Sequence, residues 1–540
     1  MENNNSNFLD SKTIVAIFIM AAIFIGWQYY IKTKYPEMYV KKDPAVSAQV
    51  NTNETPATAQ PANLENQKPT LAIDSKLPAK EDIKTIEGKN LTLNVSTIGL
   101  GIKNLKIKNY TDRDQKTIQM AEEGTGALFE LTVNKPEEKL AFKIIESSEN
   151  KIVGVADYKG AKIERTITFD DATYSFNNQV KIVNNNKAIL TVNFNITDKL
   201  EDFPAGSFFA PALDHQEVTV NHTDVTDRFA ISNITDPVIK NLPTARLLGV
   251  GTRYFAAAMI DNSEIFPEAV VVTDLKNKTV HSAMVYSINS ADGVESVLNF
   301  KTFAGPKHLD TLQKDPHLPL LIDLGFFSSI AKYLLGLLKW LNTFVSNWGV
   351  SIILLTLIVR FIVMPFNIFS YKSMKRMQLV QPQIQQLRER YKDDAKTLNQ
   401  EIMVLMKEHK VNPLGGCLPM LLQMPVFFAL YQVLGLSVDL YHAPFIFWIK
   451  DLSTKDPYFV LPILMGIAMF IQQKITPHTM DPQQARIMQF LPILFSLMTF
   501  GLPSGLTLYI FISTLFGVIQ QQIFMRDSST PVKIENKARA

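Results

Sequence analysis

Apolar and polar positions divide this chain into two regimes. Up to about residue 320 the sequence is mostly polar, apart from one early apolar run, and the remainder is crowded with apolar runs. The early run, Thr13–Ile31, has roughly the length that an α-helix needs to cross a bilayer, and Trp27 and Tyr29 near its end are typical of a membrane–water interface. A cleaved signal peptide is the alternative, but the run is long for one and lacks a clear small-x-small cleavage site. We therefore expect an uncleaved transmembrane anchor within residues 1–40.

The next two segments differ from the anchor and from each other. Residues 41–81 consist mainly of Pro, Ala, Asn, Thr, Gln and charged residues, which indicates a flexible linker. Residues 82–318 show an alternation of period two, most clearly in Ala188–Ile196, where apolar and polar residues occupy opposite strand faces. In Lys162–Phe169 the alternation is imperfect, because Arg165 shares a face with apolar residues. The pattern predicts a large antiparallel β-sandwich.

The apolar segment Leu320–Ser346 is long enough for a membrane span, but it carries a polar stripe. Small or charged residues recur in alternating steps of four and three, at Gly325, Ser329, Lys332, Gly336, Lys339, Thr343 and Ser346. The opposite side of the helix is apolar, with Phe326, Phe327, Ile330, Leu334, Leu337, Leu338 and Leu341. Such a helix fits the plane of the membrane interface better than the bilayer interior. We therefore expect residues 319–346 to form an interfacial amphipathic helix.

Five further apolar runs follow, and with the N-terminal anchor they predict six spans. The runs are Trp348–Ser370, Cys417–Leu436, Tyr458–Gln473, Ile487–Phe500 and Ser504–Phe524. The fourth run is short, and Pro492 and Pro503 stand where a helix would kink or end. The sequence thus predicts a multi-domain membrane protein, with a five-helix core over residues 347–526.

Charged loops orient these spans. Residues 371–416 carry nine Lys and Arg against five acidic residues, whereas the loop after the third span holds only Lys450 and Lys455 against three acidic residues. The positive-inside rule therefore places residues 371–416 in the cytoplasm. Six spans then put both termini, including the tail 527–540, in the cytoplasm and the β domain outside. Counting the interfacial helix as a span would break this parity.

The cytoplasmic segment has a helical pattern of its own. Apolar residues follow helical spacing in two sets, Ile384, Leu387 and Tyr391, then Leu398, Ile402 and Leu405. The turn-like sequence Lys392-Asp393-Asp394 lies between the two sets. The pattern predicts a helical hairpin over residues 371–416 that projects from the membrane, and a plain connector is the alternative.

Composition and motifs exclude several classes of function. The net charge of +3 and the lack of a long basic block argue against a specific nucleic-acid site. The one cysteine, Cys417, excludes an intrachain disulfide and a cysteine-based metal cluster. The sequence shows no nucleophile elbow, Walker loop, H-E-x-x-H motif or Rossmann glycine pattern, and its histidines lack metal-ligand spacing. We therefore expect no enzyme, no catalytic residue, no cofactor and no bound metal.

Polar residues inside the predicted spans are the strongest functional signal. Arg360 lies in the middle of Ile353–Phe366, where an arginine costs ~2.5–3.5 kcal/mol and normally faces protein or a wet cavity. No acidic residue lies in the apolar core of any span, so an ion-pair partner is not evident. Thr356 lies on the same helical face, and Gln423 and Gln472 belong to other spans. A water-filled, positively charged groove is the functional interpretation; an arginine that snorkels to the headgroups, with glutamines joining helices, is the alternative.

Four segments resemble the YidC/Oxa/Alb family of membrane protein insertases. They are Asn347–Pro365, Val411–Tyr431 (VNPLGGCLPMLLQMPVFFALY), Leu461–Lys474 and Leu502–Ile510. These motifs are long and specific, and the resemblance covers the chain from about Leu320 to Arg526. Arg360 stands at the place of the family's groove arginine. The anchor and the large outer domain resemble the Gram-negative bacterial branch.

The resemblance implies a function and a set of partners. Members of this family insert membrane proteins into the bacterial inner membrane and help them fold, alone or with the Sec translocon. The implied core encloses a hydrophilic groove that is open to the cytoplasm and the lipid, and the implied periplasmic domain is a β-supersandwich. Expected partners are nascent membrane proteins, the Sec translocon, ribosome–nascent chain complexes and membrane lipids. The expected groove residues are Arg360, Thr356, Gln423 and Gln472.

Two rival functions stay open at this point. A transporter would bind an anionic solute at the intramembrane arginine, and it predicts saturable uptake and an inverted repeat, which we do not find. A structural assembly factor would bind its partners through the outer β domain. Deletion of most of residues 45–315 separates the second rival from an insertase, which should survive the deletion.

Overall fold

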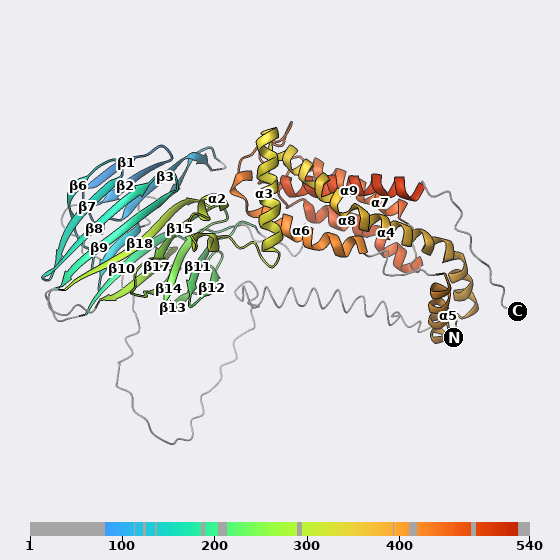
Figure 1. Ribbon diagram of the computed structural model, residues 1–540, viewed down its shortest axis with the longest axis horizontal. Helices are drawn as coiled ribbons and strands as arrows, with labels where there is room; N and C mark the ends of the chain where they lie inside the picture. The colour runs from blue at the N-terminus through green and yellow to red at the C-terminus, as the bar shows by residue number, and fades with distance from the viewer. Residues whose placement is uncertain are drawn as a thin grey trace, which may run out of the picture. The chain divides into compact units, whose positions relative to one another are not determined.

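The chain folds into a β unit and a helical unit, which are described separately below (Figure 1). The computed structural model describes residues 81–112, 114–121, 126–135, 138–184, 189–203, 213–288, 294–392, 394–409, 418–476 and 482–526. The predicted anchor (1–40), all but the last residue of the predicted linker (41–81) and the predicted tail (527–540) lie outside the described residues.

The β unit consists of two antiparallel sheets with nine described strands each (Figure 1). The first sheet has the order β1-β2-β3-β5-β10-β17-β16-β13, with β4 beside β3. Its strands are β1 (Ile83–Glu87), β2 (Leu91–Ser96), β3 (Ile102–Thr111), β4 (Thr117–Met120), β5 (Leu128–Val133), β10 (Leu190–Lys199), β13 (Ile239–Leu242), β16 (Glu268–Asp274) and β17 (Thr279–Ile288).

The second sheet has the order β12-β11-β14-β15-β18-β9-β8-β7-β6. Its strands are β6 (Lys143–Ser147), β7 (Lys151–Tyr158), β8 (Ala161–Asp170), β9 (Ser175–Asn184), β11 (Glu217–His222), β12 (Val225–Ala230), β14 (Ala245–Gly251), β15 (Phe255–Asp261) and β18 (Glu295–Pro306). The two sheets pack face to face, since the rings of Phe194 in the first and Phe300 in the second lie 4.1 Å apart between centroids. The predicted antiparallel sandwich is confirmed.

Arg165 explains the imperfect alternation of β8. Every second residue of this strand is buried from Ala161 to Ile167, and Arg165 itself is only 1% exposed. Its Nη1 donates to the carbonyl oxygens of Gly99 and Phe129, at 2.8 Å each. Burial lowers the pKa of Arg165 to about 9, which leaves the side chain charged at neutral pH. The alternation is therefore intact, with an arginine at one core position.

The helical unit contains seven main helices in its described part. They are α3 (Ser328–Val345), α4 (Trp348–Arg390), α5 (Ala395–Glu408), α6 (Leu418–Leu436), α7 (Val460–Ile475), α8 (Pro482–Thr499) and α9 (Ser504–Arg526). The short turn η4 (Val438–Leu440) also belongs to this unit, whereas η2 (Leu318–Leu321) and all but the first residue of α2 (Leu309–Leu312) belong to the β unit. Among the described residues, two helices are long and apolar enough to cross a membrane, α4 and α9 as far as Phe524, while α6 and α7 contain shorter apolar stretches.

Helix α4 continues far beyond the predicted span. It runs without interruption through Pro365 and Pro382 for 43 residues, whereas we expected the span to end near Ser370 and a separate helix to follow. At ~1.5 Å per residue its length is about twice the ~30 Å thickness of the hydrocarbon core. The first helix of the hairpin is therefore the continuation of α4. Helix α5 packs back against it through apolar residues, Met377, Val380 and Ile384 on α4 with Ile402, Leu405 and Met406 on α5.

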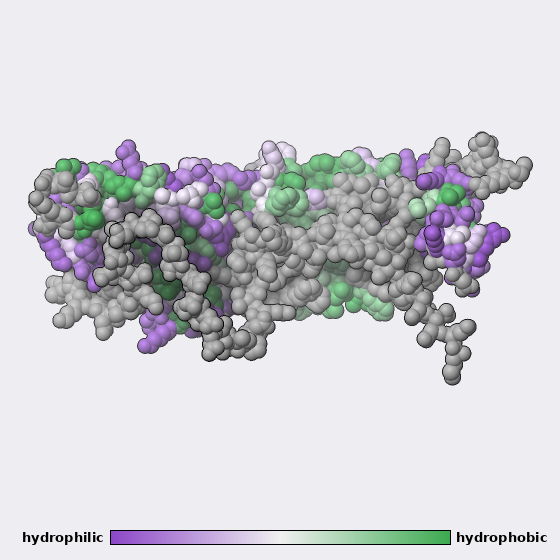
Figure 2. Space-filling model, turned by 90° about the horizontal axis from the view of Figure 1, so that it is seen from below, coloured by the Kyte–Doolittle hydropathy of each residue, from purple (hydrophilic) through white to green (hydrophobic). Residues whose placement is uncertain are grey.

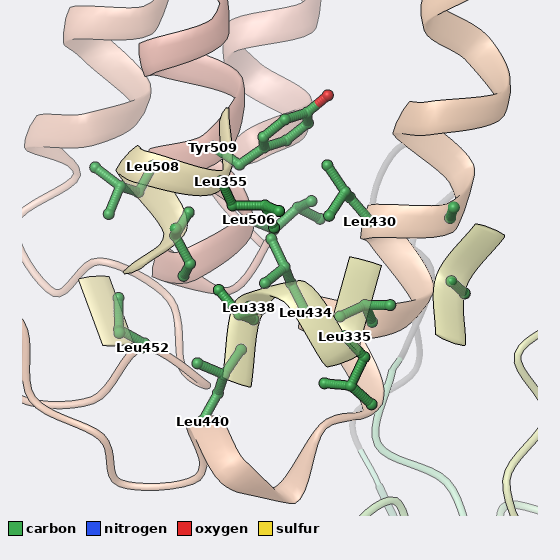
Figure 3. Close-up of a cluster of buried hydrophobic side chains, with 14 of the residues drawn as sticks. Leu335, Leu338, Leu355, Leu430, Leu434, Leu440, Leu452, Leu506, Leu508 and Tyr509 are labelled. Atoms are coloured by element: carbon green, nitrogen blue, oxygen red, sulfur yellow. The ribbon is translucent and has the colours of Figure 1, made fainter. Parts of the chain in front are cut away.

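A leucine-rich core joins α3 to the ends of α4, α6 and α9 that lie next to it (Figure 3). Its buried members include Leu335 and Leu338 of α3, Leu355 of α4, Leu430 and Leu434 of α6, and Leu506 of α9. Apolar side chains are also exposed on the outer surface of the helical unit, and Figure 2 shows them in green. The end of the unit formed by α5 is mainly hydrophilic in the same view.

The exposed surface of α3 differs from the prediction. The predicted apolar face is divided, because its Leu338 and Leu341 are buried in the core, with Ala331 and Leu335 from outside that face, while another apolar stripe is exposed. The exposed stripe contains Phe326, Ile330, Tyr333, Trp340 and Phe344. Polar residues of the predicted stripe are exposed beside it, among them Ser329, Lys332 and Thr343. Helix α3 thus has a buried face, an aromatic face and a polar face. The sequence did not reveal the division, because periodicity alone cannot distinguish burial in protein from contact with another apolar phase.

Candidate functional site

Helices α4 and α9 pack side by side in the same direction with a constant register. The contacts Arg360–Ser513 and Asn367–Gln520 each join residues that are 153 positions apart, and the stacked rings of Tyr371 and Phe524 keep the same offset. Contact residues on each helix advance by seven and then four positions, which is the spacing of a heptad seam between parallel helices. This α4/α9 seam positions the polar side chains described below.

Arg360 is bound across the seam by a neutral partner. Its Nε and Nη2 donate to the hydroxyl oxygen of Ser513, at 2.8 and 2.5 Å. Within the described part of the chain, no carboxylate lies at ion-pair distance from this guanidinium. Because a hydroxyl dipole does not neutralise a full charge, Arg360 keeps its positive charge available in a setting of low dielectric.

A second polar contact joins α6 to the same face of α9. The amide nitrogen of Gln423 donates to the hydroxyl of Tyr509, at 2.5 Å. Tyr509 lies at the edge of the leucine core, and its hydroxyl points away from the leucines (Figure 3). Since Ser513 follows Tyr509 by one helical turn, the two side chains lie on the same face of α9. A polar row therefore extends from Gln423 across α9 to Arg360.

Gln472 on α7 reaches the same place beside Gly517. A Cβ atom added at Gly517 would lie 3.3 Å from the Gln472 amide nitrogen and 3.8 Å from Nη1 of Arg360. The missing side chain of Gly517 therefore allows the guanidinium and this amide to approach the same point on α9. Both Arg360 and Gln472 are only partly buried.

Thr356 is placed differently from the other predicted site residues. It lies on α4 one turn before Arg360, but it is only 1% exposed, and its hydroxyl donates to the carbonyl oxygen of Ile352 at 2.6 Å. The hydroxyl is thus used within its own helix. The structure brings Arg360, Gln423 and Gln472 together around α9, whereas the Thr356 side chain is buried and hydrogen-bonded within α4.

Sequence reasoning did not assign the residues of α9 that connect the site. Tyr509, Ser513, Gly517 and Gln520 follow one another in steps of four, four and three, so they form one stripe of the helix. A stripe of small and polar residues in an apolar helix is a signal that could have been found. Its partners on α4, however, are fixed by the packing register, which no local pattern specifies.

A half-buried ionic cluster lies outside the apolar spans, around the loop after α6. Asp439 in η4 accepts from the Ser437 hydroxyl at 3.0 Å, and lies 3.1 Å from His308 Nδ1 and 3.2 Å from Lys339 Nζ of α3. Burial alone would raise the pKa of Asp439, but the hydrogen bond from His308 and the charge of Lys339 outweigh burial and lower the pKa to about 2. The described residues contain no group of three or more side chains arranged to hold a metal ion.

Comparison with known proteins gives a consistent result over nearly the whole chain. Residues 340–531 match the family model described as 60Kd inner membrane protein, and residues 84–337 match the model of the YidC periplasmic domain. The chain is 32% identical over 549 residues to a membrane protein insertase YidC of Geobacter metallireducens, with 95% of this chain and 98% of the relative covered. It is 31% identical over 551 residues to the corresponding protein of Francisella philomiragia, with 96% and 98% covered.

A solved structure also aligns with the chain. It is the crystal structure of an active YidC insertase with the first transmembrane domain resolved, 20% identical in sequence. The alignment covers 81% of this chain and 94% of that chain, with a TM-score of 0.36.

Proposed function

The chain belongs to the YidC/Oxa/Alb family of membrane protein insertases, and we propose that the polar row at Arg360 is where it receives the hydrophilic segments of its substrates. The protein is an inner-membrane insertase with a periplasmic β-sandwich domain, its substrates are nascent membrane proteins, and it is not an enzyme. Its relatives give no support to the alternative of an anion transporter.

In the proposed topology the chain crosses the membrane six times. The anchor in residues 1–40 and helices α4, α6, α7, α8 and α9 are the spans, and both termini are cytoplasmic. The parallel direction of α4 and α9 supports this count, because parallel spans need an odd number of crossings between them, and α6, α7 and α8 supply three. The linker 41–81 then connects the anchor to the periplasmic domain 82–318.

The same orientation gives the other segments of the chain their proposed places relative to the membrane. The segment 319–346 with helix α3 lies in the outer interface, where its exposed aromatic side chains contact lipid and its polar face contacts water. The core 347–526 contains the spans, and its hairpin 371–416 and the tail 527–540 are cytoplasmic. The basic hairpin is suited to receive substrates from ribosome–nascent chain complexes, and the exposed apolar faces of the spans are suited to contact lipids or the Sec translocon.

The proposed mechanism lowers the desolvation cost of moving a hydrophilic segment through the bilayer. In hydrocarbon each unsatisfied peptide group costs several kcal/mol, so polar partners inside the membrane reduce the barrier. Gln423, Gln472 and Tyr509 offer such partners, and Arg360 attracts acidic residues more strongly than in water. The apolar segment of the substrate moves into lipid, and its burial supplies the driving force without a nucleotide.

The position of the apolar core supports a path that opens to the cytoplasm. In this orientation the leucine core of α3, α4, α6 and α9 lies at the outer end of the bundle, and the polar row begins at Tyr509, at the edge of that core (Figure 3). The core then acts as a barrier toward the periplasm, while the α4/α9 seam becomes polar on the cytoplasmic side of it. Thr356 lies one turn before Arg360 on α4, and its hydroxyl is bonded within that helix.

A charge series at Arg360 tests this proposal. Insertion into proteoliposomes is measured for substrates whose translocated tails have equal length but are acidic or neutral. Arg360→Lys keeps most of the activity, Arg360→Ala loses severalfold with acidic tails, and Arg360→Glu is the weakest with them, because like charges repel in a medium of low dielectric. Lys474→Ala, which removes an exposed charge at the end of α7, is the matched control. Wild-type insertion by all three Arg360 variants contradicts the proposal.

A further inference from the structure

One turn beyond Gly517, the α4/α9 seam holds a pair of amide side chains that the charge-based mechanism does not use. Asn367 of α4 and Gln520 of α9 are 2% and 4% exposed, so both lie in the interior of the helical unit. The Asn367 amide nitrogen donates to the Gln520 amide oxygen at 3.4 Å, a long contact. The remaining amide atoms, Oδ1 of Asn367 and Nε2 of Gln520, are buried without a hydrogen-bond partner.

The two unpaired amide atoms of Asn367 and Gln520 are complementary to a backbone peptide group. The pair presents one acceptor and one donor, which are the two groups that a backbone peptide unit needs for its N–H and its C=O. Exchanging the oxygen and nitrogen of both amides leaves the same result, because one donor and one acceptor still remain. The pair carries no charge, so it does not distinguish acidic from neutral residues.

The location relates the pair to the charged site. Asn367 follows Arg360 by seven residues on α4, and Gln520 follows Ser513 by seven on α9, so the amide pair repeats the Arg360–Ser513 contact two turns further along the same seam. At ~1.5 Å per residue the two levels are about 10 Å apart. An extended chain covers that distance with about three residues.

We propose that Asn367 and Gln520 form an uncharged second site, which binds one backbone peptide group of the hydrophilic segment on the cytoplasmic side of Arg360. This inference rests on the proposed function and extends it. Arg360 selects for acidic side chains, while the amide pair serves any polypeptide. When the chain enters, the peptide N–H donates to Oδ1 of Asn367 and the peptide C=O accepts from Nε2 of Gln520, so both unpaired amide atoms are satisfied while the Asn367–Gln520 contact is kept.

The test compares paired variants on defined substrates. The double variant N367L/Q520L removes both amides and fills the seam with apolar groups, a replacement that is nearly neutral for stability. The variant N367Q/Q520N exchanges the two side chains and keeps one donor and one acceptor. Thr514→Val is the control, because the Thr514 hydroxyl donates to Ile510 O of its own helix at 2.8 Å. Insertion in proteoliposomes is measured with acidic, neutral Gly/Ser and Pro-rich tails of equal length.

The backbone role predicts a distinctive profile. N367L/Q520L inserts acidic and Gly/Ser tails about tenfold more slowly, the effect of losing two hydrogen bonds, whereas N367Q/Q520N and Thr514→Val insert them at nearly the wild-type rate. Pro-rich tails, which lack backbone N–H groups, show a smaller loss in N367L/Q520L than Gly/Ser tails.

Other outcomes overturn the proposal in separable ways. Wild-type insertion of Gly/Ser tails by N367L/Q520L, with the Arg360 series behaving as expected, overturns the second site alone. A loss confined to acidic tails shows that the pair acts through Arg360, which also overturns it. An equal loss with Gly/Ser and Pro-rich tails shows that the pair holds only water or the two helices together. The failure of the Arg360 series itself rejects the proposed function instead.

Discussion

At the scale of single residues, Arg360 and its partner differ in how far the sequence reveals them. An arginine within an apolar run is conspicuous, because such a residue is costly unless it serves a purpose. Ser513, which accepts from that arginine, is unremarkable in sequence, since serine is common in membrane helices. The pairing follows from the α4/α9 register, so the chemistry of the site was predictable at Arg360, whereas its geometry was not.

Removal of the Tyr509 hydroxyl tests the polar row. Tyr509→Phe leaves the Gln423 amide without its partner, so we expect insertion of hydrophilic tails to fall by about two- to tenfold, the value of one hydrogen bond. The loss is similar for acidic and neutral tails, because the charge at Arg360 is unchanged. Initial rates in proteoliposomes measure it.

Thr356→Val provides the comparison for Tyr509→Phe. The Thr356 hydroxyl is bound within its own helix, so its removal should have a smaller effect than removal of the Tyr509 hydroxyl. A larger loss with Thr356→Val than with Tyr509→Phe contradicts the placement of the row on α9.

Arg165 in the β domain is a second residue whose position the sequence predicted, but whose hydrogen-bond partners it did not predict. The sequence placed it on the apolar face of β8, and it occupies that face: the carbonyl oxygens of Gly99 and Phe129 accept from its Nη1 and the Asn178 side chain accepts from its Nη2, while Nε is buried without a partner. Gly99 and Phe129 come from distant parts of the chain. Strand alternation therefore predicts which residues are inside, but it does not predict how a buried charge is satisfied.

At the scale of elements, the sequence predicted the type and approximate extent of the helices and strands. It did not predict where a helix continues or which elements pack together. Period-two alternation indicated β8 and β10, and the apolar runs indicated α4, α6, α7 and α9. The order of strands depends on contacts between distant segments, such as β5 beside β10 and β9 beside β18, which local patterns do not specify. Helix α4 continues through Pro365 and Pro382, although each proline removes a backbone hydrogen bond.

The Asp439 cluster predicts a pH-dependent attachment of α3. The pKa of Asp439 is about 2 in the folded protein, against an ordinary value of 3.8. Because the folded pKa is lower, the ionised carboxylate contributes about 2 kcal/mol of stability above pH 3.8, and this contribution is lost as the pH falls through 2. Asp439→Asn should therefore lower the thermal midpoint of the detergent-solubilised protein at pH 7.

The control for this prediction is a carboxylate on the surface. Asp157→Asn changes an exposed residue of β7 and should leave the midpoint unchanged. The difference between Asp439→Asn and wild type should decrease as the pH approaches 2. A difference that stays constant from pH 7 down to that value would show that packing, and not the ionised carboxylate, holds α3.

At the scale of the whole molecule, the loop charges and the parallel α4/α9 pair support one orientation, which labelling from one side of the membrane can test. The single cysteine of the chain, Cys417, is replaced by serine, and new cysteines are introduced one at a time at the exposed residues Lys396 of α5 and Lys455 of the loop before α7. A membrane-impermeant maleimide added to intact spheroplasts should label K455C and spare K396C. Labelling of K396C in sealed spheroplasts contradicts the six-span topology.

The central claim is that hydrophilic segments of substrates pass along the polar row, and photo-crosslinking tests it most directly. A photoreactive residue is placed at Gln423 in the row, or at Leu515, which is 39% exposed on another side of α9 as a matched control. Ribosome-bound nascent chains, stalled with the tail partly inserted, are then irradiated. We predict that the hydrophilic tail crosslinks to position 423 and not to position 515. A tail that crosslinks equally at both positions, or only at 515, contradicts the account.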